Sequence, residues 1–156
     1  MTERSSGSAF SGSSPSAEEL RARLAFDELV LSLSAALVGA PLNEIDAAIE
    51  RALAEVGRVI GTGRAYVFQF SPDGELMTAT HEACSPGVPS ARATFRDTPV
   101  APFAWAMDRL VRGQPIEIKA VEAVPAEAAN IAEVMRQIGV ASILTIPLAG
   151  GGRIFG

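Results

Sequence analysis

The stretch THEACSPG, residues 80–87, holds the side chains of this sequence with the widest chemical repertoire. His81 is the only histidine and Cys84 the only cysteine, and Glu82 lies between them. A zinc site would need further nitrogen or sulfur ligands, which the chain does not contain. In a strand, neighbouring residues such as His81 and Glu82 also point to opposite faces. The stretch therefore predicts neither a metal site nor haem held by His81, and a lone histidine is usually packed or hydrogen-bonded.

The sequence also offers little for covalent catalysis. Exchange between an attacking and a resolving thiol needs two cysteines, and Cys84 has no partner. No serine lies in the glycine pattern of a nucleophile elbow. The glycine runs at 61–63 and 150–152 precede strands, whereas a phosphate loop opens a helix. We therefore expect no catalytic residues. Arg92 and Arg96 could clamp an anion, but such arginines are more often solvated.

Composition limits the class of protein. The 156 residues suit one domain, and a hydrophobic content of 48% indicates that a buried core stabilises it. The net charge is −5 and the only lysine is Lys119, so no basic surface for nucleic acid is expected. The first residues have no apolar run of signal-peptide length, and the apolar run at 29–40 is too short to span a bilayer. These features predict a cytoplasmic protein with no membrane segment and no nucleic-acid partner.

Three parts follow one another along the chain. Residues 1–15 are rich in serine and glycine and are expected to form a disordered tail. Residues 16–40 are expected to form an N-terminal helix, because Ser16 and Glu19 have the spacing of a capping box. Residues 41–156 form the remaining domain.

The N-terminal helix carries more apolar surface than a single stripe. One helical stripe contains Phe26, Val30, Leu33 and Leu37, and the neighbouring faces are apolar too. The extra width is explained either by a second helix in a homodimer or by burial of the helix on most sides.

Helices and strands alternate in the remaining domain. Apolar periodicity and turn residues predict helices at about 43–60, 102–113 and 125–139, and strands at 64–70, 75–84, 114–120, 141–149 and from 153. The stretch 85–101 holds four prolines and is expected to be a long loop. A strand that opens four residues before the end leaves a sheet edge unfinished, so we expect a fragment without its last strand and closing helix.

The turn between the first two strands predicts how they pair. Pro72 and Asp73 suit a type I turn and Gly74 suits the left-handed position after it, which makes a three-residue hairpin loop. This register places Arg64 opposite Glu82, as an ion pair.

One face of the predicted hairpin mixes aromatic bulk with hydroxyl groups. The register brings together Tyr66, Phe68, Thr78, Thr80 and Glu82. Apolar walls with a few placed polar groups are typical of ligand pockets, although an ordinary core with an ion pair explains the same residues. His81 lies on the opposite face, toward the expected helices.

These blocks together resemble a GAF domain, from about residue 24 to the end. The order is two helices, RAYVFQF, THEACSPGV, FAWAMDRLVRGQPIEI and VPAEAANIAEVMRQIGVASILTIPLAGGGRIFG. The resemblance implies an α+β sandwich: a central antiparallel sheet with a helical layer on one face and a pocket covered by loops and helices on the other. Gly63 replaces the usual aspartate before the strand arginine, and Ala83 the common aromatic after THE, which weakens any detailed ligand analogy.

The resemblance also extends the set of candidate residues. It implies a structural clasp between Arg64 and Glu82, and it places Phe103 and Trp105 in the short helix that closes the pocket. Together with strand parity it adds Ile143 and Thr145 to the pocket side.

No cofactor follows from these residues, and a small-molecule ligand of unknown identity is expected. The asparagine–lysine pair of cyclic-nucleotide-binding members is missing, as are the cysteine beside a histidine and the proline-serine-aspartate run of bilin-binding members. The resemblance implies a sensory domain that is not itself an enzyme. It would relay ligand binding through dimer helices to a linked output domain, such as a histidine kinase or a nucleotide or diguanylate cyclase. The alternatives are a ligand-free dimerisation or spacer module and, more remotely, an enzyme like free methionine sulfoxide reductase.

Overall fold

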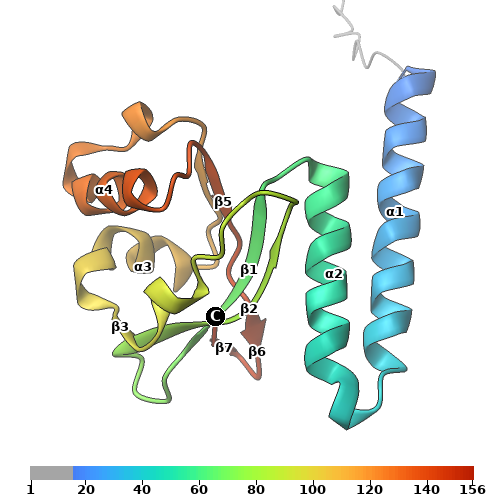
Figure 1. Ribbon diagram of the computed structural model, residues 1–156, viewed down its shortest axis with the longest axis horizontal. Coiled ribbons are helices and arrows are strands. Elements are labelled where there is room, and N and C mark those ends of the chain that lie inside the picture. The colour runs from blue at the N-terminus through green and yellow to red at the C-terminus, as the bar shows by residue number, and fades with distance from the viewer. Residues whose placement is uncertain (1–15) are drawn as a thin grey trace, which may run out of the picture. The chain divides into compact units, whose positions relative to one another are not determined.

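The computed structural model describes residues 16–156, in two units that divide after Pro41 (Figure 1). The predicted tail, residues 1–15, lies outside the described residues. Each unit is considered by itself. Between residues 16 and 156, no helix combines the length and the apolar character that crossing a membrane requires.

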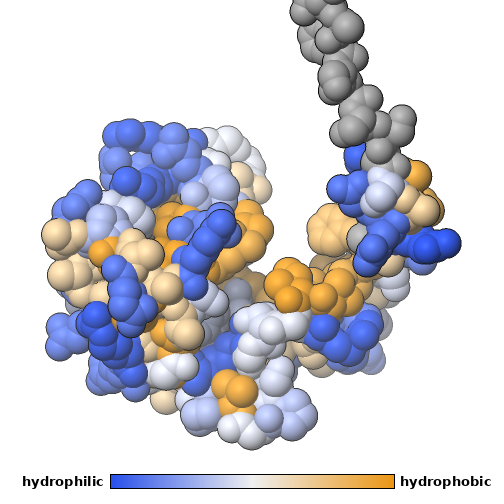
Figure 2. Space-filling model, turned by 90° about the horizontal axis from the view of Figure 1, so that it is seen from above, coloured by the Kyte–Doolittle hydropathy of each residue, from blue (hydrophilic) through white to orange (hydrophobic). Residues whose placement is uncertain are grey.

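The first unit is the helix α1, Ala17–Val38, and its N-terminus confirms the predicted capping box. The Glu19 amide donates to Ser16 Oγ at 3.2 Å, and the Ser16 amide donates to the Glu19 carboxylate at 2.7 Å. The hydrogen bond from the Ser16 amide, together with that from its side chain, lowers the pKa of Glu19. Figure 2 shows apolar surface exposed on this helix. Its exposed apolar residues include Leu24 and Leu31. The helix is thus apolar around much of its circumference, as its sequence predicts.

The second unit, residues 42–156, contains helices and short antiparallel strands. Its helices are α2 (Ile45–Ile60), α3 (Ala104–Leu110) and α4 (Ala129–Gln137), with 3-10 turns at Leu42–Glu44, Arg92–Phe95, Ala101–Phe103, Val121–Ala123 and Ala126–Ala128. Its strands are β1 (Arg64–Phe70), β2 (Leu76–Cys84), β3 (Thr98–Pro99), β4 (Ile116–Ile118), β5 (Ile143–Thr145), β6 (Ala149–Gly150) and β7 (Arg153–Ile154). The hydrogen-bonded groups are β1–β2–β3, β4–β5 and β6–β7, and a bond from the Phe70 amide to the Phe155 carbonyl, 2.9 Å, joins the end of β1 to the last hairpin.

The helix α2 packs against β2 and β1 through small residues (Figure 1). Ala48 and Gly57 are buried in this helix. A Cβ atom at Gly57 would lie 3.5 Å from the Thr62 methyl group, which is ordinary van der Waals contact. Gly61 ends the helix in the left-handed conformation, with φ of 77°, which glycine adopts without strain.

The pairing of β1 with β2 differs from the predicted register. Phe70 lies opposite Met77, and the loop contains four residues instead of three, because the Ser71 amide bonds to the Leu76 carbonyl. Ser71 Oγ also bonds to the Leu76 amide at 2.9 Å and to Asp73, and these bonds hold the wider turn. The three-residue loop was therefore a wrong prediction.

A β-bulge shifts the register again in the middle of the hairpin. Val67 lies opposite His81 and Phe68 opposite Ala79, so Thr80 is an extra residue without a partner on β1. Beyond the bulge, Tyr66 lies opposite Glu82. Because the bulge adds one residue to β2, the β2 residues before it point to the opposite face from the one they would have in a regular strand.

Two clusters form the core of the second unit. The larger one joins α3, α4 and β4 around Leu110, Ile116, Ile118, Val121, Ala128, Ile131 and Met135. The smaller one contains Ala79, Ala91 and Phe95, with Phe68 packed against it. Phe95 comes from the long loop after β2, so this loop contributes to the core and is not only a cover.

Candidate functional site

A hollow of about 810 Å³ lies between α2, β2 and the loop that follows β2. Most of its lining residues have polar side chains, and the full set is Asp46, Glu50, Gln69, Thr78, Ala79, Thr80, His81, Ser90, Arg92, Ala93, Arg96 and Asp97. The volume is in the range of small-molecule sites. The hollow is on the side of β2 that carries His81, where the sequence predicted only packed helices.

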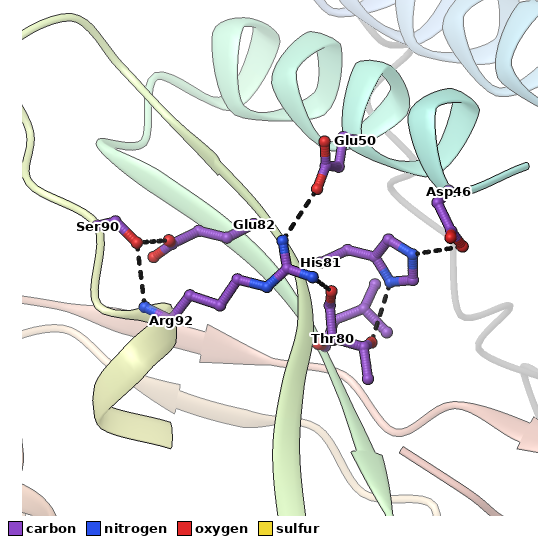
Figure 3. A network of polar contacts seen from close by, with 8 residues as sticks. Asp46, Glu50, Thr80, His81, Glu82, Ser90 and Arg92 are labelled. Atoms are coloured by element: carbon purple, nitrogen blue, oxygen red, sulfur yellow. Dashed lines mark hydrogen bonds and ion pairs between the residues drawn. The ribbon is translucent and has the colours of Figure 1, made fainter. Parts of the chain in front are cut away.

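His81 connects β2 to α2 at one end of this hollow (Figure 3). The residue is 8% exposed, and its Nε2 lies 3.2 Å from Asp46 Oδ1 on α2. Its Nδ1 lies 3.0 Å from the hydroxyl of Thr80, the bulged residue. The prediction that His81 faces the helical layer and is hydrogen-bonded is therefore confirmed.

Arg92 connects the loop to both α2 and β2. Its Nη1 donates to Glu50 Oε1 at 3.2 Å, and its Nη2 donates to the carbonyl of Thr80 (Figure 3). The bulge leaves this carbonyl outside the regular β1–β2 pairing. The three elements around the hollow are thus tied together by one side chain.

Glu82 fastens the loop from the other face of β2. Its Oε1 accepts a bond from the Ala91 amide at 2.9 Å, and its Oε2 accepts one from the Ser90 hydroxyl. Ala91 is buried, so the carboxylate satisfies an amide that water cannot reach. Glu82 is therefore a loop anchor and not a pocket wall.

The predicted ion pair between Arg64 and Glu82 is not formed, and this correction follows from the register. Arg64 lies opposite Cys84, and it donates from Nε to the Pro89 carbonyl at 2.8 Å and from Nη2 to the Ile138 carbonyl at 2.9 Å. Both members of the predicted pair thus hold backbone groups of other segments.

The aromatic side of the hairpin is filled by protein side chains. The ring of Phe95 lies edge-on to Phe68, with centroids 5.2 Å apart, and 6.5 Å from Tyr66. Tyr66 and Phe68 line neither this hollow nor a second one of about 400 Å³. The sequence missed Phe95, whose only signal was a large aromatic residue in a proline-rich loop.

The other predicted pocket residues lie at the larger core cluster, apart from the aromatic side of the hairpin. Phe103, Trp105 and Ile143 pack against the larger core cluster, and Thr145 pairs with Ile116 on β4. None of them lines either hollow. Trp105 is covered by Arg109, whose Cζ lies 3.9 Å from the ring centroid. The structure therefore does not gather these residues into one site.

Thr78 and Thr80 do line the polar hollow, but for a reason that the sequence did not show. The shifted register pairs Thr78 with Gln69, so it does not share a face with Phe68 as predicted. Its hydroxyl donates to Asp97 Oδ1 at 3.2 Å and accepts from the Asp97 amide at 3.0 Å. Asp97 has a φ of 48°, and strained residues of this kind often occur at functional sites.

The site contains hydrogen-bonding and charged groups, among them the hydrogen-bonded chain of Thr80, His81 and Asp46. Within residues 16–156, no cluster of three histidine, cysteine or acidic residues is placed to hold a metal. Cys84 is exposed, but partial desolvation of the thiol, with the nearby Glu82 charge as a second cause, raises its pKa, whereas a nucleophilic cysteine needs a lowered pKa. The donors and acceptors of the site come from α2, β2 and the loop after β2.

Comparisons with known proteins identify the fold. The phycocyanobilin-bound GAF domain of a cyanobacterial phytochrome is similar with a TM-score of 0.68 and 19% identity, over 83% of this chain and 75% of that one. The phycoerythrobilin-bound GAF domain of a cyanobacterial phytochrome gives 0.67 and 17%, over 86% and 79%. The chromophore-binding domain of a bacteriophytochrome from R. palustris gives 0.63 and 19%, over 86% and 51%. At these identities the likeness concerns the fold alone.

Among curated proteins, no sequence matches this chain. The family model of the GAF domain matches residues 44–156, which is the second unit almost in full. The antiparallel strands, the helix packed on one side of the hairpin and the loop and helices on the other agree with that assignment. This protein therefore belongs to the GAF domain family.

Proposed function

We propose that this chain is the sensory part of a signalling protein and that the polar hollow between α2, β2 and the following loop is its ligand site. One observation carries the proposal: Arg92 ties all three elements around the hollow through Glu50 and the Thr80 carbonyl. A ligand that competes for these contacts would have different affinities for the tied and the released loop. Such a difference is what a sensor needs to shift a conformational equilibrium.

The charges around the hollow favour a small polar ligand. Asp46, Glu50 and Asp97 supply negative charge, and Arg92 and Arg96 supply positive charge. Arg96 makes no ion pair within the described residues, so its guanidinium is available to an incoming carboxylate or phosphate. A molecule with groups of both charges, such as an amino acid, matches this lining best.

A thermal-shift screen tests the sensory role. Amino acids, nucleotides and aromatic acids are added singly to the protein, and a ligand of the hollow raises the melting temperature by mass action. The Arg92→Gln variant should lose that rise. Arg51→Gln is the matched control, because Arg51 is also exposed and lines neither hollow. A rise that is equal in both variants would place the ligand elsewhere.

A ligand-free spacer or dimerisation module is the second candidate function. It is supported by the filled aromatic side of the hairpin, where Phe95 occupies the space beside Tyr66 and Phe68. If no compound of the panel stabilises the protein at concentrations near 10 mM, roughly the weakest binding of interest, this candidate is preferred.

The wider signalling context is also part of the proposal. The apolar circumference of α1 suits a helix shared by two copies, and light scattering at high concentration would detect this dimer. A protein that stays monomeric would contradict it. In this proposal the chain has no catalytic activity, its location is cytoplasmic, and it acts on a linked output domain such as a histidine kinase or cyclase.

A further inference from the structure

A second hollow, of about 400 Å³, lies on the other side of the loop that carries Arg92. It is lined by Arg64, Pro89, Ser90, Ala91, Thr94, Arg136, Gln137, Ile138 and Gly139. The lining includes two arginines and no acidic residue, in a protein with a net charge of −5. This concentration of positive charge is unlike the mixed charges of the polar hollow.

Arg64 gives this positive charge a fixed position at the wall. Two of its nitrogens bond to the Pro89 and Ile138 carbonyls, so the side chain is held on both sides. Its third nitrogen, Nη1, is buried without a hydrogen-bond partner among the described residues. A buried N–H group without an acceptor costs free energy. Negative charge brought close to this guanidinium would therefore be stabilised.

Arg136 supplies a second guanidinium that is free to move. The residue is exposed and makes no ion pair within residues 16–156. It lies near the C-terminus of α4, where backbone carbonyls carry partial negative charge. These carbonyls already accept hydrogen bonds. The Gly139 amide donates to Arg136 O, the Val140 amide to Met135 O, and Arg64 to Ile138 O. The Glu82 carboxylate lies behind Ser90 and Ala91 of the lining, so the two arginines supply the larger charge at the hollow.

The rest of the lining is hydroxyl and apolar. Thr94 offers a hydroxyl group, whereas the Ser90 hydroxyl already donates to Glu82. Pro89, Ala91 and Ile138 offer apolar surface. Inorganic phosphate would leave most of a 400 Å³ hollow unfilled. A carboxylate attached to a small apolar body would use both parts of the lining.

We infer that this second hollow binds a small organic carboxylate, with Arg136 as the main charge partner, Thr94 as a hydrogen-bond donor and Arg64 as the fixed cation behind them. The inference does not rest on the ligand of the polar hollow. It adds a second site on the opposite side of the same segment, since Ser90 lines both hollows. Binding here would act directly on the loop that carries the Arg92 tie.

The test is an NMR titration of the isotope-labelled full chain with benzoate. Saturable shifts of the backbone amides of 90–94 and 136–139 are expected. Benzamide has the same shape without the charge and should bind at least about tenfold more weakly, as expected for the loss of a charge-assisted hydrogen bond. Phosphate has the charge without the apolar body and should also bind more weakly. Equal binding of benzamide, or benzoate shifts confined to other residues, would overturn the inference.

Variants assign the site without disturbing the core. Arg136→Gln should weaken benzoate binding about tenfold, and Thr94→Val about threefold. Arg153→Gln removes an equally exposed arginine on β7 and should change nothing. Arg51→Gln, at an exposed residue that lines neither hollow, should leave benzoate affinity within about twofold. Unchanged benzoate affinity in Arg136→Gln, or its loss in Arg92→Gln but not Arg136→Gln, would show that this hollow is not the site.

Discussion

The two faces of the β1–β2 hairpin are built differently, although they belong to the same strands. On one face, Tyr66 and Phe68 meet Phe95 in an interior that the protein fills by itself. On the other, His81 and Thr78 belong to polar contacts around an open hollow. Aromatic side chains beside hydroxyl groups in a sequence therefore do not establish a ligand pocket. Such a face is a pocket only if no other residue of the protein fills the space beside it, and here Phe95 fills that space.

The largest effect should come from removing that filling residue. Phe95 is 7% exposed and contacts both other rings, so Phe95→Ala should lower the free energy of unfolding by about 3 to 4 kcal/mol. Urea denaturation followed by circular dichroism measures the loss. Val111→Ala is the control, since Val111 is 59% exposed and should change stability by less than about 0.5 kcal/mol. A near-neutral Phe95→Ala would mean that the aromatic face is a pocket after all.

A smaller effect is expected from the anchor that holds the loop across this face. Glu82→Ala leaves the buried Ala91 amide without its acceptor and should lower the free energy of unfolding by about 2 kcal/mol. Glu82→Gln keeps an acceptor oxygen and should lose less than half of that. The same denaturation experiment compares the two variants. Equal losses would show that the negative charge, and not the hydrogen bond, matters.

On the polar face, a substitution should lower the free energy of unfolding only slightly. The Arg92–Glu50 pair is about half exposed, with side-chain exposures of 49% and 45%. Arg92→Gln should therefore lower the free energy of unfolding by less than about 1 kcal/mol. Hydrogen exchange of the Ser90–Phe95 amides should nevertheless become faster, because the loop loses its tie to α2. A loss as large as that of Phe95→Ala would remove the distinction between the faces.

The smallest effect concerns Cys84, beside Glu82 on the aromatic side. Partial desolvation of this exposed thiol and, after it, the Glu82 charge raise its pKa. The neutral thiol therefore stabilises the folded state. The whole of this stabilisation is present at a pH below the pKa of the unfolded chain, and it is lost as the pH rises through the pKa of the folded state. Glu82→Gln should lower the pKa and speed alkylation by iodoacetamide in mildly alkaline solution. A pH–rate profile that is identical in both proteins would contradict this account.

The sequence predicted elements whose signals are local. The capping box of α1, the apolar period of α2 and the dense β-branched and aromatic run of β1 each depend on neighbouring residues, and all three were confirmed. The family assignment was confirmed as well, because it rests on the order of several such blocks.

The candidate site could not be predicted in the same way. Ser71 widens the turn by its hydrogen bond to Leu76, and Thr80 forms a bulge in β2. Neither feature has a recognisable local pattern in the sequence. Two register shifts changed the partners of Arg64 and the face of Thr78. The assignment of pocket residues failed because it depended on an uninterrupted count along both strands.

The bulge at Thr80 has a consequence for how such a site can arise during evolution. Deleting Thr80 would join Ala79 directly to His81, and every other β1–β2 pair would keep its present face. The deletion would remove only the carbonyl that accepts the hydrogen bond from Arg92 and the hydroxyl that lies beside His81. We expect the deletion variant to fold with the same far-ultraviolet circular dichroism but with a released loop, and an unfolded product would refute this. A single codon would then be enough to add or remove the loop tie without redesigning the sheet.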